Sequence, residues 1–89
     1  LVSSSAAQVV VETVKLAEDG SGDLIVRLYE STGGRADSRI AFAGVAEKIW
    51  LTDFLELPTS AEQVAGGSID LQFRPFQVIT LRISGLQID

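Results

Sequence analysis

L-I-V-R-L-Y-E at residues 24–30 lies between two glycine-containing turns and carries the clearest strand signal in the chain. Its residues alternate between two sides of an extended strand: Leu24, Val26 and Leu28 share one side, and Ile25, Arg27 and Tyr29 share the other. A period of two lines one face of a strand and cannot line one face of a helix. The stretch therefore predicts a β-strand that turns Leu24, Val26 and Leu28 toward the core.

The preceding segment, V-V-V-E-T-V-K-L at residues 9–16, predicts a second strand because β-branched residues suit a pleated, half-buried surface. Residues 18–23 are polar and contain two glycines, as a hairpin connection requires. The two strands are therefore expected to pair antiparallel. The inward face of 9–16 stays open: Val10, Val14 and Leu16 share a side with Glu12, whereas Val9 and Val11 share theirs with Thr13 and Lys15.

The remainder of the chain predicts further strands at 36–43, 47–55, 69–74 and 77–84. The segment 47–55 is apolar on both sides, so a helix competes with a strand there. A loop with one helical turn is expected over 57–63, and residues 1–8 are expected to be a linker or frayed end. The predicted fold is all-β: one antiparallel, immunoglobulin-like β-sandwich of about six or seven strands over residues 9–89.

Composition excludes several classes of function. Seven Lys and Arg residues are scattered in a chain of 89 residues with a net charge of −5, so nucleic acid is not an expected partner. No apolar run approaches the ~20 residues that cross a bilayer, so no membrane partner is expected either. The chain has no His and no Cys, which removes the serine triad, the thiol nucleophile and the usual zinc sites.

Calcium binding is the most tempting hypothesis for a site. Asp19, Ser21, Asp23 and Glu30 occupy positions 1, 3, 5 and 12 of the EF-hand pattern. However, the glycine of position 6 is replaced by Leu24, and a strand would carry Glu30 roughly 20 Å from the turn. The pattern therefore predicts a solvated hairpin turn. Carboxylates at strand ends, Glu30 among them, are expected to meet arginines.

Four segments together resemble a known family. They are V-V-V-E-T-V-K-L-A-E-D-G at 9–20, L-I-V-R-L-Y-E-S-T-G-G-R-A at 24–36, T-D-F-L-E-L-P at 52–58 and L-Q-F-R-P-F-Q-V-I-T-L-R-I at 71–83. In order and spacing they resemble the last β-sandwich domain of the α-mannosidases of glycoside hydrolase family 38, most closely the cytosolic and bacterial branch. Phe54 stands where that branch usually has Leu.

The resemblance implies a non-catalytic role. In that family the zinc ion and the Asp nucleophile of the retaining reaction lie in an N-terminal β/α domain, so no catalytic or metal-binding residue and no cofactor transfers to this chain. The chain is expected to be the C-terminal domain of a bacterial, cytoplasmic α-mannosidase, docked on the remaining domains and meeting carbohydrate only through that parent enzyme. The expected domain-interface residues are Arg27, Tyr29, Glu30 and Trp50. The alternatives are an immunoglobulin-like interaction domain or a carbohydrate-binding module that stacks sugars on Trp50 or Tyr29.

Overall fold

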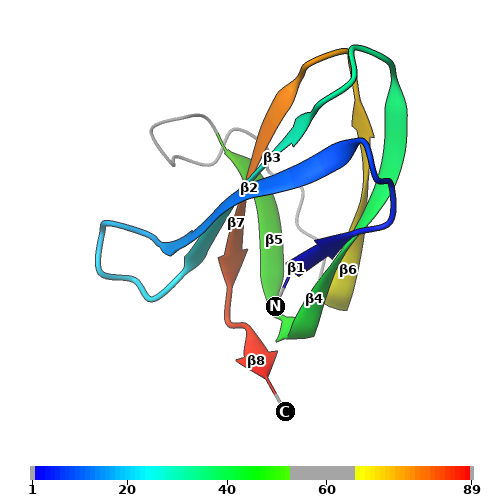
Figure 1. The fold of residues 1–89 in the computed structure, drawn as a ribbon. Helices are drawn as coiled ribbons and strands as arrows, with labels where there is room; N and C mark the ends of the chain where they lie inside the picture. The colour runs from blue at the N-terminus through cyan, green and yellow to red at the C-terminus, as the bar shows by residue number, and fades with distance from the viewer. Residues whose placement is uncertain (1, 53–65, 89) are drawn as a thin grey trace.

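A computed structural model describes residues 2–52 and 66–88, and within them the chain forms eight strands and no helix (Figure 1). The strands are β1 (Val2–Ser4), β2 (Val9–Leu16), β3 (Leu24–Glu30), β4 (Ala36–Ala46), β5 (Lys48–Thr52), β6 (Gly66–Phe73), β7 (Val78–Ser84) and β8 (Gln87–Ile88). One sheet has the order β1-β4-β6 with β8 paired to β4, and the other has the order β2-β3-β7-β5. Every pairing is antiparallel, so the predicted all-β sandwich is confirmed.

The core lies between the two sheets and is mostly aliphatic. Val26 and Leu28 of β3 and Leu81 of β7 are 0% exposed, and they pack with Ile40 of β4 and Phe73 of β6 from the opposite sheet. Strand β3 is central because it pairs with β2 on one side and β7 on the other. The predicted inward positions Val26 and Leu28 are thereby confirmed.

A β-bulge in β2 resolves the inward face that the sequence left open. The register with β3 shifts between Val11 and Thr13, which leaves Glu12 as the extra residue. Directly paired residues share a face of the sheet. Val11 pairs with Leu28 before the bulge and Val14 pairs with Val26 after it, so both halves of β2 turn valines inward.

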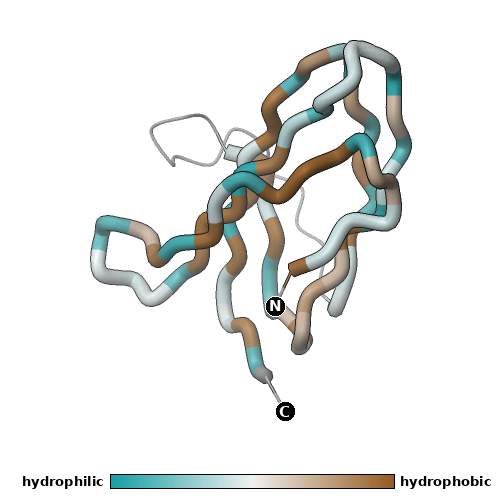
Figure 2. Tube along the Cα trace, in the orientation of Figure 1, coloured by the Kyte–Doolittle hydropathy of each residue, from teal (hydrophilic) through white to brown (hydrophobic). Residues whose placement is uncertain are grey.

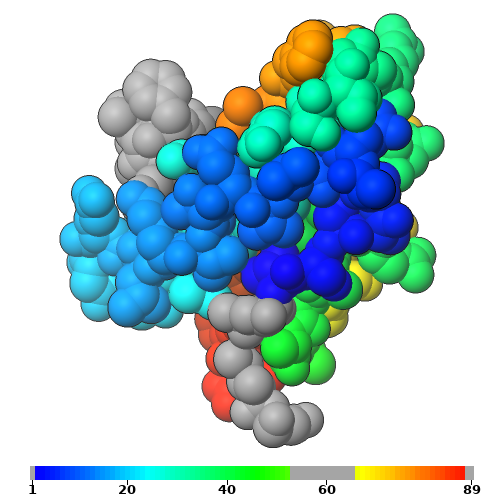
Figure 3. Space-filling view, viewed as in Figure 1, coloured from blue at the N-terminus to red at the C-terminus, as the bar shows by residue number. Residues whose placement is uncertain are grey.

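Beyond the bulge, the β2–β3 hairpin projects past the sandwich (Figures 1 and 3). Val14 is 40% exposed and Leu16 is 64% exposed although both lie on the inner face of their sheet. The connecting loop is hydrophilic, whereas the first half of β2 is strongly apolar (Figure 2). The outer part of this hairpin therefore extends beyond the opposite sheet, which leaves Val14 and Leu16 partly exposed.

The structure differs from the sequence prediction at three places. Val2–Ser4 forms β1, paired with β4, where a linker or frayed end was expected; the Ser4 hydroxyl reaches that of Ser38 at 2.7 Å and anchors the segment. Strand β4 continues past residue 43 to Ala46 and pairs with β8 at Gly44 and Val45. The short strands β1 and β8 raise the count above seven. Strand β5 confirms the strand interpretation over the helix for residues 48–52. The expected loop at 57–63 lies outside the described residues.

No helix in the described ranges meets the length and hydropathy needed for a membrane span.

Candidate functional site

A buried carboxylate closes one end of the sandwich. Glu30 is 0% exposed, and its two oxygens accept hydrogen bonds from three separate segments. Oε1 accepts from the amides of Gly33 at 2.6 Å and Phe76 at 3.1 Å. Oε2 accepts from the Gln8 amide nitrogen at 3.0 Å and from the amide and hydroxyl of Thr32 at 2.9 Å and 2.5 Å. We call Gln8, Glu30, Thr32, Gly33 and Phe76 the Glu30 cluster.

The Glu30 cluster holds its carboxylate in the charged form. Burial opposes the charge, but the hydrogen bonds from Thr32, Phe76 and Gly33 outweigh it and lower the pKa of Glu30 from 4.5 to about 2. The carboxylate thus works as a permanent anion that ties the β1–β2 connection, the β3–β4 turn and the β6–β7 turn together.

The turn that donates to Glu30 has an unusual conformation. Pro75 and Phe76 lie between Arg74 and Gln77, whose backbone oxygen and amide are joined by a 3.0 Å hydrogen bond. Pro75 must have a negative φ, while Phe76 has φ +56°, a combination that defines a type II turn. Glycine or asparagine is the usual residue at that third position. Phe76 is the one described non-glycine residue with positive φ, and the residue is 68% exposed.

The ring of Phe76 lies against the backbone of Gly33. A Cβ atom added at Gly33 would come within 2.8 Å of two ring carbons, and Gly33 itself has φ +85°. Figure 1 shows the β3–β4 and β6–β7 turns side by side at the top of the molecule. Gly33 is therefore required twice, for its backbone angle and for the space that the ring occupies.

Gly33→Ala is expected to destabilise the chain by about 1–3 kcal/mol, because an L-residue at positive φ is strained and the new methyl meets the Phe76 ring. In a Phe76→Gly background the steric part disappears, so the double variant should be more stable than the sum of the single effects by about 0.5–2 kcal/mol. Urea denaturation of the four proteins measures this coupling. Strict additivity would show that the two residues do not press on each other.

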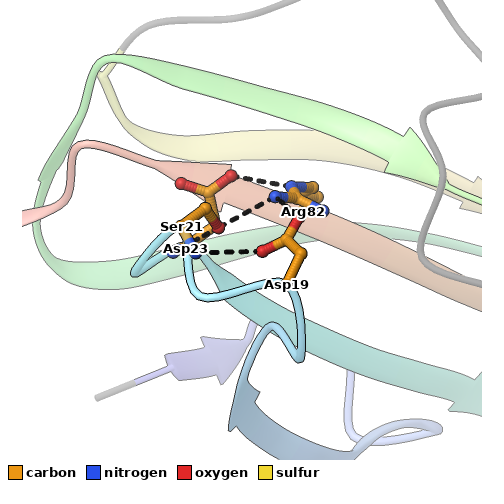
Figure 4. Close-up of polar contacts among 4 residues, drawn as sticks. All are labelled: Asp19, Ser21, Asp23 and Arg82. Atoms are coloured by element: carbon orange, nitrogen blue, oxygen red, sulfur yellow. Dashed lines mark hydrogen bonds and ion pairs between the residues drawn. The ribbon is translucent and has the colours of Figure 1, made fainter.

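A second cluster fixes the projecting hairpin (Figure 4). Arg82 of β7 donates from Nε to Asp23 Oδ2 at 2.7 Å and from a terminal nitrogen to Asp19 Oδ2 at 2.7 Å and Ser21 Oγ at 2.9 Å. The side chains of Arg82 and Asp23 are only 11% and 13% exposed. Hydrogen bonds from Ser21 and from Arg82 hold the pKa of Asp19 well below its ordinary range. The hydrogen bonds to Asp19 and Asp23 raise the pKa of Arg82. We call Asp19, Ser21, Asp23 and Arg82 the Arg82 cluster.

The Arg82 cluster also explains the EF-hand pattern. The guanidinium of Arg82 lies between the oxygens that the calcium hypothesis required, so a cation from the protein itself already balances Asp19 and Asp23. Glu30, at position 12 of the pattern, instead accepts hydrogen bonds from the amides of Gly33 and Phe76. Within residues 2–52 and 66–88 no group of His, Cys, Asp and Glu is arranged to hold a metal ion.

The structure separates the four predicted interface residues. Arg27, Tyr29 and Trp50 lie on the outer face of the β2-β3-β7-β5 sheet, since their neighbours Leu28 and Ile49 turn inward. Arg27 contacts Thr80 at 3.4 Å, and the Lys48 ammonium lies 5.8 Å from the centre of the Trp50 ring. Tyr29 and Trp50 are both half-buried.

The structure contradicts the predictions that Glu30 faces a neighbouring domain and meets an arginine. Its side chain points into the domain rather than toward a neighbouring surface, and it meets backbone amides rather than an arginine. The physical reason is the strand period: Glu30 shares a side with the buried Leu28 and falls where the strand leaves the core. Gln8 and Phe76 were not identified from sequence; Pro75 at the second position of a four-residue turn was the local signal for the latter.

Comparison with known proteins identifies a family and a relative. The family model for the glycosyl hydrolases family 38 C-terminal beta sandwich domain matches residues 8–81. Human alpha-mannosidase 2C1 (Homo sapiens) is 36% identical over 83 residues, which make up 89% of this chain and 8% of that protein. The chain thus spans a small fraction of the length of the relative that it matches.

Proposed function

The chain belongs to the family of C-terminal β-sandwich domains of glycosyl hydrolases family 38, and on that premise we propose that it is a non-catalytic, docked domain of an α-mannosidase. The resemblance predicted from sequence is confirmed by the family match, which runs from Gln8 at the start of the Glu30 cluster to Leu81 in β7. The mannosidase assignment draws on the human relative and its name. In the parent enzyme, hydrolysis of α-mannosides would take place in other domains.

The observation that carries the non-catalytic role is how the carboxylates of this domain are used. A glycoside hydrolase needs one carboxylic acid whose pKa is raised so that it can protonate the leaving group. Glu30 has its pKa lowered to about 2 and its oxygens fully engaged by five donors of the domain itself. Asp19 and Asp23 are held by Arg82. These groups support a structural role.

The purified chain is expected to show no hydrolysis of an aryl α-mannoside, with or without added zinc, because the proposed chemistry belongs to the parent's other domains. The release of the coloured aglycone is followed over hours at high protein concentration, with the full-length parent polypeptide as the positive control. Turnover above the blank that purifies together with the chain would overturn the proposal.

The remaining parts of the proposal come from the resemblance. The parent would use zinc in a retaining reaction, reside in a bacterial cytoplasm and bring carbohydrate into contact with this domain only through its own active site. Arg27, Tyr29 and Trp50 stay predicted docking residues on the outer face of the β2-β3-β7-β5 sheet.

A further inference from the structure

We infer that Phe76 is the anchor by which this domain docks on a neighbouring domain of its parent polypeptide, its ring entering an apolar pocket with carboxylates at the rim. The inference rests on the proposed function and identifies the contact through which that docking takes place.

The conformation of Phe76 is unfavourable for the isolated domain. Its φ of +56° belongs to a region that L-residues rarely adopt, and the residue is 68% exposed to water. Strained backbone of this kind persists where the surroundings impose it, and it concentrates at functional sites. A glycine in this turn would remove both the backbone strain and the exposed ring, so the stability of the domain does not explain the residue.

The Glu30 cluster imposes this conformation. The carboxylate of Glu30 receives the Phe76 amide at 3.1 Å, and the ring rests on the backbone of Gly33. The ring is therefore held in one place before any partner arrives. Ordering an anchor in advance reduces the conformational entropy that docking would otherwise lose.

The surroundings of Phe76 indicate the chemistry of the partner. Val78, two residues further on, is 54% exposed and extends the apolar surface. Arg35 and Arg74 are exposed and line one recess, together with Gln77 and a single carboxylate, that of Asp37. In the described part of the chain neither guanidinium has an ion-pair partner. An aromatic anchor beside arginines is typical of the centre of a protein interface, and it fits an apolar pocket flanked by Asp or Glu.

The occupant is a domain of the same polypeptide because most of the related enzyme lies outside this chain. The aligned region makes up only 8% of the matched human mannosidase, so in that relative the corresponding domain has a much larger protein as its neighbour. A tethered neighbour also needs little intrinsic affinity, since a linker supplies a high effective concentration.

The test is Phe76→Gly, measured in the 89-residue chain and in the full-length parent. In the isolated chain the melting temperature should stay unchanged or rise by a few degrees, because glycine tolerates positive φ. In the parent, the unfolding of this domain should shift down by at least about 5 °C, because the anchor is lost. Val45→Thr, which alters another exposed apolar side chain, is the matched control and should change neither protein by more than about 2 °C.

Hydroxyl-radical footprinting of Phe76 in the unmodified proteins provides a second measurement. The ring should be oxidised readily in the isolated chain and at least about five-fold more slowly in the parent, since Phe76 is 68% exposed before docking.

The other outcomes contradict the inference in distinct ways. Equal shifts in chain and parent, equal oxidation in both, or unfolding of the isolated chain by Phe76→Gly would overturn the anchor role and leave the proposed function standing. Protection of Phe76 by an oligomannoside in the isolated chain, with none in the parent, would assign the ring to sugar binding instead. If the unmodified domain has the same unfolding temperature as an isolated chain and within the parent, it does not dock on the parent, and the proposed function fails as well.

Discussion

Glu30→Gln is expected to lower the melting temperature of the chain by at least about 10 °C, more than most single substitutions in a domain of this size. Glutamine keeps the shape of the side chain but replaces one carboxylate oxygen by the NH2 group of an amide. That group would face either the amides of Gly33 and Phe76 or the donors of Gln8 and Thr32. Buried donors on one of these two sides would then point at a donor, and the segments that carry them would lose their acceptor.

Glu18→Gln is the matched control. Glu18 forms an ion pair with Lys15 at 3.6 Å, and its side chain is 83% exposed. A surface pair of this kind contributes little, so the control should shift the melting temperature by no more than about 2 °C. Equal shifts in the two variants would mean that the Glu30 cluster is not a structural centre.

The pH dependence of the unfolding free energy is a second test of the structural role of Glu30. Because the pKa of Glu30 is lowered from 4.5 to about 2 on folding, its ionised form stabilises the folded chain fully above about pH 4.5. That stabilisation is lost progressively as the pH falls from 4.5 toward 2. The difference in unfolding free energy between the unmodified chain and Glu30→Gln, measured by urea denaturation across this range, should therefore shrink on acidification. A difference that stays constant would contradict the assignment.

Much of the fold followed from local pattern. The bounds of β2 and β3 and the hairpin between them agree with the sequence prediction, because alternation and a glycine-rich turn are local signals. The ambiguous inward face of β2 was itself informative. Its valines change sides of the alternating pattern at Glu12, and a bulge at Glu12 produces this change. Pairing between distant strands, such as β1 with β4, depends on tertiary contacts and was not predictable from local pattern.

The candidate site was harder to predict for a physical reason. Glu30 could be recognised as unusual, but three of its five donors are backbone amides. Every residue except proline carries such an amide, so side-chain chemistry gives no signal for them. Gln8, Thr32 and Phe76 come together only when three connections meet at one end of the sandwich. The acidic residues of the hairpin were found in sequence, whereas their partner Arg82 lies about 60 residues away and is brought to them by β7 pairing with β3.

Arg82→Met is expected to lower the melting temperature by about 5–10 °C. Methionine retains an apolar side chain of similar length, so the packing along β7 is largely kept and the lost charge is what the variant tests. Asp23, whose side chain is 13% exposed, would remain without the guanidinium that now binds it at 2.7 Å. The β2–β3 loop would lose the contacts that hold it against β7, and the hairpin should become more sensitive to proteolysis.

Arg39→Met supplies a control of the same chemistry at a different depth. Arg39 pairs with Asp70 at 2.9 Å, but the two side chains are 65% and 72% exposed. Solvent screens that pair, so its loss should shift the melting temperature by less than about 3 °C. The comparison isolates burial, because both variants exchange an ion-paired arginine on a strand for methionine. Similar shifts in the two variants would mean that the Arg82 cluster contributes no more than an ordinary surface pair.

Adding Asp23→Asn to Arg82→Met distinguishes the origin of the loss. If most of the destabilisation comes from leaving a poorly solvated carboxylate unpaired, neutralising that carboxylate should restore part of the lost melting temperature. If it comes from the contacts between the hairpin and β7, the second substitution should restore nothing, because asparagine cannot replace the missing guanidinium. Partial recovery is the expected result: the carboxylate lies against the sheet at 13% exposure, whereas Asp19, at 53%, can be hydrated once Arg82 is gone.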